Sequence, residues 1–180
     1  DLGPNTGGMG CYSPVPFFTP ELRETVIQTI LKPTLRGLQN EGVEYRGVLY
    51  CGLMLTEDGP KVVEYNARFG DPECQILMAR LENDVLPMLL ACAGVGDEKL
   101  EDFTPKWKRE NAVLVVMAAQ NYPATPRKGD TISGLENAQS AGALVFHAGT
   151  KIGESGEIQT NGGRVLGVVG LGESFQKARE

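Results

Sequence analysis

The longest uninterrupted apolar segment of this chain is Ala112–Ala119, which is only eight residues long. A segment of that length suits a buried strand and falls far below the ~18 apolar residues that a membrane-spanning helix needs. We therefore expect no membrane partner. Apolar residues make up 41% of the sequence and charged residues 22%, which is the composition of an ordered globular protein rather than a disordered one.

Charge and cysteine content narrow the class of protein further. The chain carries 17 basic and 23 acidic residues, a net charge of −6, so we expect no nucleic-acid partner, which would favour a basic face. The cysteines form no C-x-x-C pair, which argues against a zinc ribbon, and we expect free, mostly buried thiols in a reducing compartment, the cytoplasm. They are Cys11, Cys51, Cys74 and Cys92.

The first half of the chain reads as a long helix, a hairpin and two more helices. Thr19-Pro20 is typical of a helix start, and the apolar spacing that follows predicts a helix to residues 40–42 with a kink at Pro33. The strands at residues 46–55 and 61–66 are separated by a turn sequence, which indicates a hairpin. Further helices are expected after Asp71-Pro72 and after Asp84.

The second half changes to short strands separated by glycine turns. The polar segment Gly94–Thr104 predicts a boundary between a domain at residues 1–100 and a small β-rich domain at 101–180, and Ser174 predicts a last helix. The fold class is therefore α/β (α+β). The predicted strands are residues 112–119, 144–150, 157–159 and 164–169.

The most informative segment is Val62–Arg68. Alternate residues of a strand share a face, so Glu64 and Asn66 point the same way, and Arg68 joins them if the strand continues. A carboxylate and an amide oxygen suit Mg²⁺ or Mn²⁺ beside phosphates, and a guanidinium can neutralise charge that develops during phosphoryl transfer. The alternative is the solvated face of an edge strand.

Three more charged residues are candidates for binding a substrate or phosphate. Asp71 is either the N-cap of the helix that follows or a substrate contact, and Glu73 either compensates the helix dipole or contacts substrate. Arg164 follows Asn161-Gly162-Gly163, which is either a phosphate cradle or an ordinary hairpin turn. His147, on an apolar strand, is read as a structural residue, and Trp107 as a surface anchor.

Several motifs resemble those of the glycinamide ribonucleotide synthetase (phosphoribosylamine–glycine ligase) family of ATP-grasp ligases. The similarity runs in register over nearly the whole chain and is clearest in RFGDPECQ at residues 68–75. The other similar motifs are GPNTGGMG, VEYNARFGDPE, VVMAA…YP, VFHAGT and TNGGRVL.

The resemblance implies a function and roles for particular residues. It implies ATP-dependent joining of glycine to 5-phosphoribosylamine through glycyl phosphate, a step of de novo purine synthesis. Glu64 and Asn66 would be magnesium ligands, and Arg68 would stabilise the acyl phosphate. The segment Gly7, Gly8 and Met9 resembles the family's substrate loop, whose backbone amides can bind an anion.

The resemblance covers only the C-terminal part of the family. It implies the second part of an ATP-grasp core followed by most of the β-rich C-terminal domain, truncated at its end. We therefore expect these 180 residues alone to be inactive and to self-associate through uncovered sheet edges. The alternatives are another ATP-grasp carboxylate–amine ligase, a carboxylase-type purine enzyme, or a non-catalytic ATP-grasp remnant that serves as an interaction module.

Overall fold

The computed structural model describes residues 3–97 and 99–180. Asp1, Leu2 and Glu98 of the predicted boundary segment lie outside the described residues. The chain forms two compact units, each assembled from separate stretches. The first unit is Asp1–Pro14, Asp71–Leu81 and Trp107–Glu180, and the second is Val15–Gly70 and Glu82–Lys106. The division of the chain at residue 100 stays a prediction.

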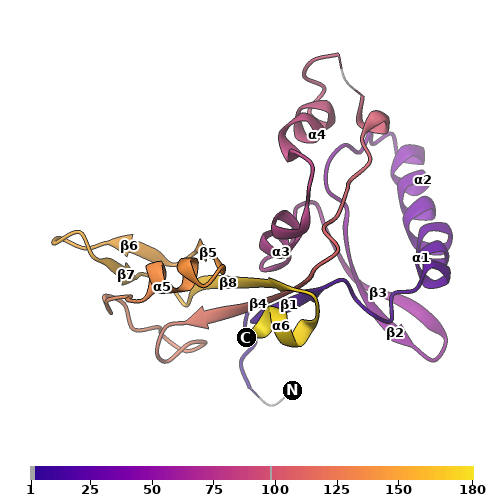
Figure 1. Cartoon of the computed structure of the whole chain (residues 1–180). Coiled ribbons are helices and arrows are strands. Elements are labelled where there is room, and N and C mark those ends of the chain that lie inside the picture. The colour runs from indigo at the N-terminus through magenta and orange to yellow at the C-terminus, as the bar shows by residue number, and fades with distance from the viewer. Residues whose placement is uncertain (1–2, 98) are drawn as a thin grey trace. The chain divides into compact units, whose positions relative to one another are not determined.

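The first unit is built on a four-stranded antiparallel sheet in the order β1-β4-β8-β5 (Figure 1). The apolar segment at residues 112–119 falls almost entirely in β4, so the prediction of a strand there is confirmed. The strands are β1 (Gly10–Ser13), β4 (Asn111–Ala118), β5 (Leu144–His147) and β8 (Arg164–Gly172).

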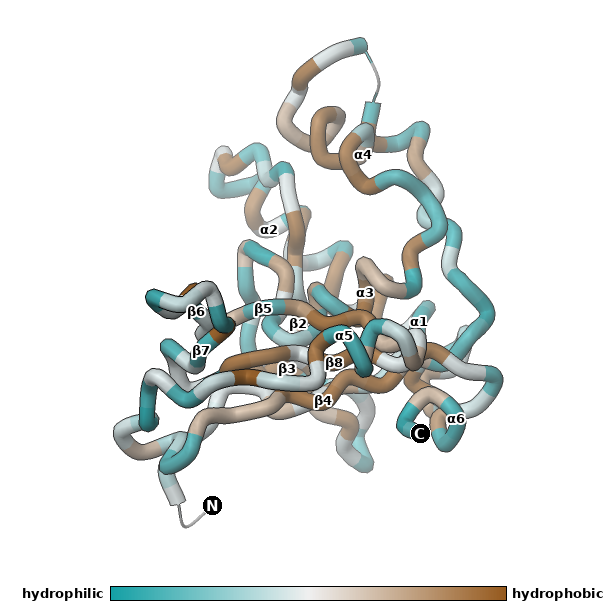
Figure 2. The backbone as a smooth tube through the Cα atoms, turned by 60° about the vertical axis from the view of Figure 1, so that its left-hand side comes forward, coloured by the Kyte–Doolittle hydropathy of each residue, from teal (hydrophilic) through white to brown (hydrophobic). Residues whose placement is uncertain are grey.

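One face of this sheet forms the main core. Alternate residues of β4 are buried, and Leu114 is 1% exposed. They pack against Ile76 and Ala79 of helix α3 (Glu73–Arg80). Figure 2 shows hydrophobic colour along much of β4, in agreement with this burial. The remaining members of the cluster are Ala112, Val116 and Val169.

Helix α6 (Phe175–Arg179) covers part of the opposite face. Ser174 caps it through a bond from the Lys177 N–H at 3.2 Å, so the predicted final helix is confirmed. Because Val169 is buried in the main core, its neighbour Gly170 points to the other face. A Cβ atom on Gly170 would overlap the carbonyl oxygen of Ala178, so the close approach of α6 requires glycine here.

Gly170→Ala should therefore lower the free energy of unfolding by about 1–3 kcal/mol, the usual cost of overpacking. Gly167→Ala is the matched control on the same strand, because its Cβ would meet Leu114 Cδ1 at an ordinary 3.7 Å. Urea denaturation of both variants measures the difference. Equal stability of the two would show that α6 does not depend on contact at residue 170.

The rest of the first unit is a short hairpin and a helix. The predicted strand at 144–150 is interrupted, because Gly149 leaves the sheet and lies against Gly162, where a Cβ on Gly149 would be 2.6 Å from the Gly162 Cα. A short helix and the edge strand β1 were not predicted from the sequence. The helix is α5 (Leu135–Ser140), and the hairpin is formed by β6 (Thr150–Ile152) and β7 (Ile158–Thr160).

The second unit begins with a helix capped as the sequence predicts. Thr19 accepts a hydrogen bond from the Leu22 N–H at 3.2 Å. A wide π-helical turn lies just before Pro33. In a regular α-helix, the ring of Pro33 would clash with the carbonyl four residues earlier, and the wider turn lies where that clash would occur. The helical segments are α1 (Pro20–Val26), η1 (Ile27–Leu31) and α2 (Lys32–Asn40).

The predicted hairpin is confirmed, with Thr56 opposite Gly59 at its turn. The prediction that its first strand begins at residue 46 is wrong, because Gly47 has φ +133° and the strand begins only at Tyr50. Asp84 caps the predicted next helix, accepting from the Leu86 N–H at 2.9 Å. The remaining elements are β2 (Tyr50–Thr56), β3 (Gly59–Asn66), α4 (Val85–Cys92) and η2 (Leu100–Asp102).

Candidate functional site

The second unit holds the predicted metal pair on β3. Glu64 and Asn66 lie on one face of the strand, and the Asn66 side-chain amide donates a hydrogen bond to Glu64 Oε1 at 2.9 Å. Among residues 3–97 and 99–180, the amide oxygen of Asn66 and Oε2 of Glu64 have no further hydrogen-bond partner, so both are available. Glu64 is exposed and Asn66 half-buried, so both can be reached from solvent.

This donor set fits a hard divalent cation that takes few protein ligands. Mg²⁺ keeps several waters and is held by one or two side chains together with substrate phosphates. Within the part of the chain that the structure describes, no group of three or more histidine, cysteine or acidic side chains could hold a metal by itself. The pair can therefore contribute two ligands, and phosphates or water must supply the rest.

Arg68 lies beyond the end of the strand. β3 stops at Asn66, and the Arg68 guanidinium donates through Nη1 to the Phe69 carbonyl at 2.9 Å. The strand therefore does not continue far enough to place Arg68 on the face of the pair by alternation. Arg68 is exposed, so its remaining guanidinium donors are accessible to an anion.

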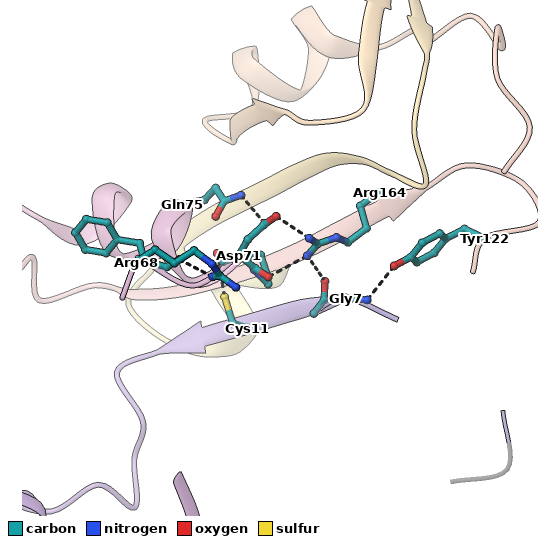
Figure 3. Close-up of polar contacts among 10 residues, drawn as sticks. Gly7, Cys11, Arg68, Asp71, Gln75, Tyr122 and Arg164 are labelled. Carbon is teal, nitrogen blue, oxygen red and sulfur yellow. Dashed lines mark hydrogen bonds and ion pairs between the residues drawn. The ribbon is translucent and has the colours of Figure 1, made fainter. Parts of the chain in front are cut away.

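The first unit holds a second cluster, centred on Arg164 (Figure 3). Its guanidinium donates to the Gly8 carbonyl at 3.1 Å, to the Asp71 carbonyl at 2.9 Å and to Asp71 Oδ2 at 2.6 Å. The Arg164 side chain is 25% exposed and the Asp71 side chain 53% exposed. Arg164 therefore joins the start of β8 to two segments that are distant in the sequence.

Of the two alternatives for Asp71, the structure excludes the helix N-cap. α3 begins at Glu73 after Pro72, without a side-chain capping bond. The Asp71 carboxylate accepts instead from Arg164 and, at 3.1 Å, from the Gln75 side chain, so both of its oxygens are engaged. Glu73 lies in the first turn of α3, where a carboxylate stabilises the positive helix end.

The loop at residues 7–9 lies against this cluster. A Cβ atom on Gly7 would be 2.7 Å from Arg164 Cζ, and one on Gly8 would be 3.3 Å from the Asp71 carbonyl oxygen. The Met9 carbonyl accepts from the Val116 N–H at 3.0 Å. The structure thus brings Gly7 and Gly8 together with Asp71 and Arg164, and glycine at 7 and 8 permits the close approach.

Sequence reasoning missed Tyr122, which also contacts this loop. Its hydroxyl accepts a hydrogen bond from the Gly7 N–H at 2.9 Å (Figure 3). The Tyr-Pro pair in the VVMAA…YP motif was a signal that could have marked it. His147, in contrast, has a local partner, since its Nδ1 lies 3.1 Å from Thr150 Oγ1.

Burial raises the pKa of the Cys11 thiol to about 12, and the nearby Glu73 carboxylate adds to the effect. The thiol donates to the Pro72 carbonyl, with 3.6 Å between sulfur and oxygen. Burial also raises the pKa of Cys74, and the charge of Asp71 contributes. All four cysteines are free and none is fully buried, so they are thiols as predicted but less buried than expected.

Cys11 should therefore resist alkylation far above neutral pH. The thiolate is the reactive form, and a pKa of about 12 leaves about one part in a thousand of it at pH 9. Iodoacetamide labelling at pH 9, followed by peptide mass spectrometry, should modify Cys11 hundreds of times more slowly in the folded chain than in guanidinium. Equal rates in the two conditions would show that the thiol is not shielded.

Two family models match the chain. The model for the ATP-grasp (A) domain of phosphoribosylglycinamide synthetase matches residues 1–74, and the model for the C domain of the same protein matches residues 112–180. The fold and these matches place the chain in the ATP-grasp class. It belongs to the phosphoribosylglycinamide synthetase family, which confirms the resemblance seen in the sequence.

Named relatives agree with this assignment. The chain is 49% identical over 180 residues to the phosphoribosylamine–glycine ligase of Mesorhizobium japonicum, and 51% identical over 182 residues to that of Phenylobacterium zucineum. It matches the crystal structure of the Thermotoga maritima phosphoribosylamine–glycine ligase with TM-score 0.78 and 39% identity over 99% of this chain. The chain spans 41–42% of the length of these relatives.

Proposed function

We propose that the full-length protein, the whole reading frame to which these residues belong, is an ATP-dependent ligase. It joins glycine to 5-phosphoribosylamine through glycyl phosphate in de novo purine synthesis, in the cytoplasm. The relatives that are 49–51% identical carry the name phosphoribosylamine–glycine ligase, which favours this reaction over a carboxylase-type alternative. The observation that carries the proposal is the Glu64–Asn66 pair, whose oxygens share one face of β3.

Glu64 and Asn66 would hold Mg²⁺, or Mn²⁺, beside the phosphates of ATP. A bound divalent cation neutralises phosphate charge and orients the terminal phosphate for transfer. In this role Glu64 supplies the charged oxygen, and Asn66 supplies a neutral oxygen while its amide nitrogen holds the Glu64 carboxylate in place. The strand keeps both side chains on one side, so little ordering is needed when the ion binds.

Arg68 would act on the carboxyl group of glycine. Phosphoryl transfer to a carboxylate concentrates negative charge on the transferring group, and a guanidinium stabilises that charge through paired N–H donors. Its bond to the Phe69 carbonyl fixes one end of the guanidinium and leaves the other donors for the anion. The amine of phosphoribosylamine then attacks the acyl carbon, and inorganic phosphate leaves.

The cluster of the first unit would serve substrate binding. The Gly7–Met9 loop would offer backbone amides to an oxyanion, with Asp71 and Arg164 supporting it. Because Arg164 already bonds to Gly8 and Asp71, a role in holding the loop is favoured over a direct contact with phosphate. Glu73 contributes a charge at the start of α3, close enough to Cys11 to raise the pKa of its thiol.

The proposal is tested by measuring ADP formation with ATP, Mg²⁺, glycine and freshly prepared phosphoribosylamine. The full-length protein should form ADP only when both glycine and phosphoribosylamine are present. The 180-residue chain alone should form none, because positioning of the triphosphate, of order 7–11 kcal/mol at best, needs groups from both sides of the nucleotide. ADP formation that needs neither glycine nor phosphoribosylamine would contradict the proposal. If the short chain formed ADP as fast as the full-length protein, catalysis would not need groups from outside these 180 residues.

A further inference from the structure

Tyr122 lies in a tight turn directly after β4. Its backbone N–H donates to the Ala119 carbonyl at 3.2 Å, and the preceding Asn121 has φ +74°, a conformation in which asparagine is enriched. The ring packs against Gly163, where a Cβ atom would be 2.4 Å from Tyr122 Cδ2 and 2.6 Å from Tyr122 Cε2. The turn and the contact with Gly163 therefore restrict the position of the ring and of its hydroxyl.

That hydroxyl accepts the Gly7 N–H at 2.9 Å, across 115 residues of sequence. It is one of three contacts that hold successive residues of the loop. The Gly8 carbonyl accepts from Arg164, and the Met9 carbonyl accepts from Val116. The three partners of the loop are Tyr122, Arg164 and Val116. All of them lie in residues 112–180, the segment that matches the C-domain model.

The consequence is an asymmetry within the loop. The Gly7 N–H is already used, so it does not serve as an anion donor as the sequence predicted for this loop. The N–H groups of Gly8 and Met9 have no acceptor among residues 3–97 and 99–180. The loop is thus held through one amide and two carbonyls, and two adjacent amides stay available.

We propose that Tyr122 is a positioning residue for substrate binding, on the basis of the proposed ligase function. Its hydroxyl holds Gly7, and through Gly7 it places the Gly8 and Met9 amides to bind an oxyanion of a substrate. The oxyanion is the carboxylate of glycine or the phosphate of phosphoribosylamine, and the experiment distinguishes the two. Tyr122 itself does not touch the reacting atoms.

The test compares Tyr122→Phe with Tyr45→Phe in the full-length protein. Each substitution removes one hydroxyl that makes one hydrogen bond to the backbone, and the Tyr45 hydroxyl bonds to the Val48 carbonyl at 2.6 Å, outside this cluster. Tyr122→Phe should speed exchange of the Gly7 amide about fivefold, as the loss of one typical hydrogen bond implies. The exchange is read by mass spectrometry with residue resolution.

Steady-state kinetics then separate a positioning role from a structural one. Tyr122→Phe should raise KM for glycine or for phosphoribosylamine about fivefold, with kcat and KM for ATP unchanged, and the substrate affected identifies the oxyanion. Tyr45→Phe should change none of these values. Unchanged Gly7 exchange, or a lower kcat with every KM unchanged, would overturn the proposal.

The two proposals fail in different ways. If the wild-type protein forms no ADP with glycine and phosphoribosylamine, the ligase function fails and the substrate role of Tyr122 fails with it. If the wild type is active but Tyr122→Phe leaves both KM values unchanged, only the positioning role is overturned. Faster Gly7 exchange in that variant would then show that Tyr122 holds the loop without affecting substrate.

Discussion

Glu64→Gln should lower the ligation rate of the full-length protein on the order of a hundredfold, and should shift the Mg²⁺ dependence to higher concentration. Glutamine keeps the shape of the side chain and its contact with Asn66, but it removes the charged oxygen of the pair. Loss of a group that merely supports a metal ligand costs roughly 10–100-fold, so loss of the charged ligand should reach the upper end of that range.

The measurement is the initial rate of ADP formation against Mg²⁺ concentration. Glu57→Gln is the matched control, because Glu57 is an exposed glutamate in the turn of the same hairpin and lies outside the pair. The control should follow the wild-type curve. If Glu64→Gln also followed it, Glu64 would not bind the metal.

Arg68→Lys should lower kcat about a hundredfold, with a smaller change in KM for ATP. Lysine keeps the charge but loses the planar pair of donors, and removal of one preorganised donor at a developing charge typically costs 10²–10³ in kcat. Loss confined to KM would instead show that Arg68 binds ATP in the ground state. Arg36→Lys, an exposed arginine of α2, is the control and should leave both values unchanged.

The parts of the fold that were predicted correctly depend on local sequence. Thr19, Asp84 and Ser174 each cap a helix through their own side chains, and such bonds reach only two or three residues along the chain. Alternation on β3 likewise placed Glu64 and Asn66 on one face. These interactions are readable from sequence because both partners are neighbours in it.

The parts that were missed depend on contacts between distant residues. Asp71 has the sequence features of an N-cap, but Arg164, 93 residues away, binds its carboxylate. The interruption of the predicted strand at 144–150 arises from Gly149 meeting Gly162. Tyr122 was not predicted as part of the site because its partner, Gly7, is 115 residues distant.

The most direct test of the ligase mechanism follows an oxygen atom. Glycine labelled with ¹⁸O in its carboxyl group is incubated with the full-length protein, ATP, Mg²⁺ and phosphoribosylamine, and the inorganic phosphate is examined by mass spectrometry. Attack of the glycine carboxylate on the terminal phosphate, followed by displacement by the amine, transfers one ¹⁸O to each phosphate released. The proposal predicts one labelled phosphate for each ADP. Phosphate that forms at the same rate as ADP but contains no ¹⁸O would contradict it.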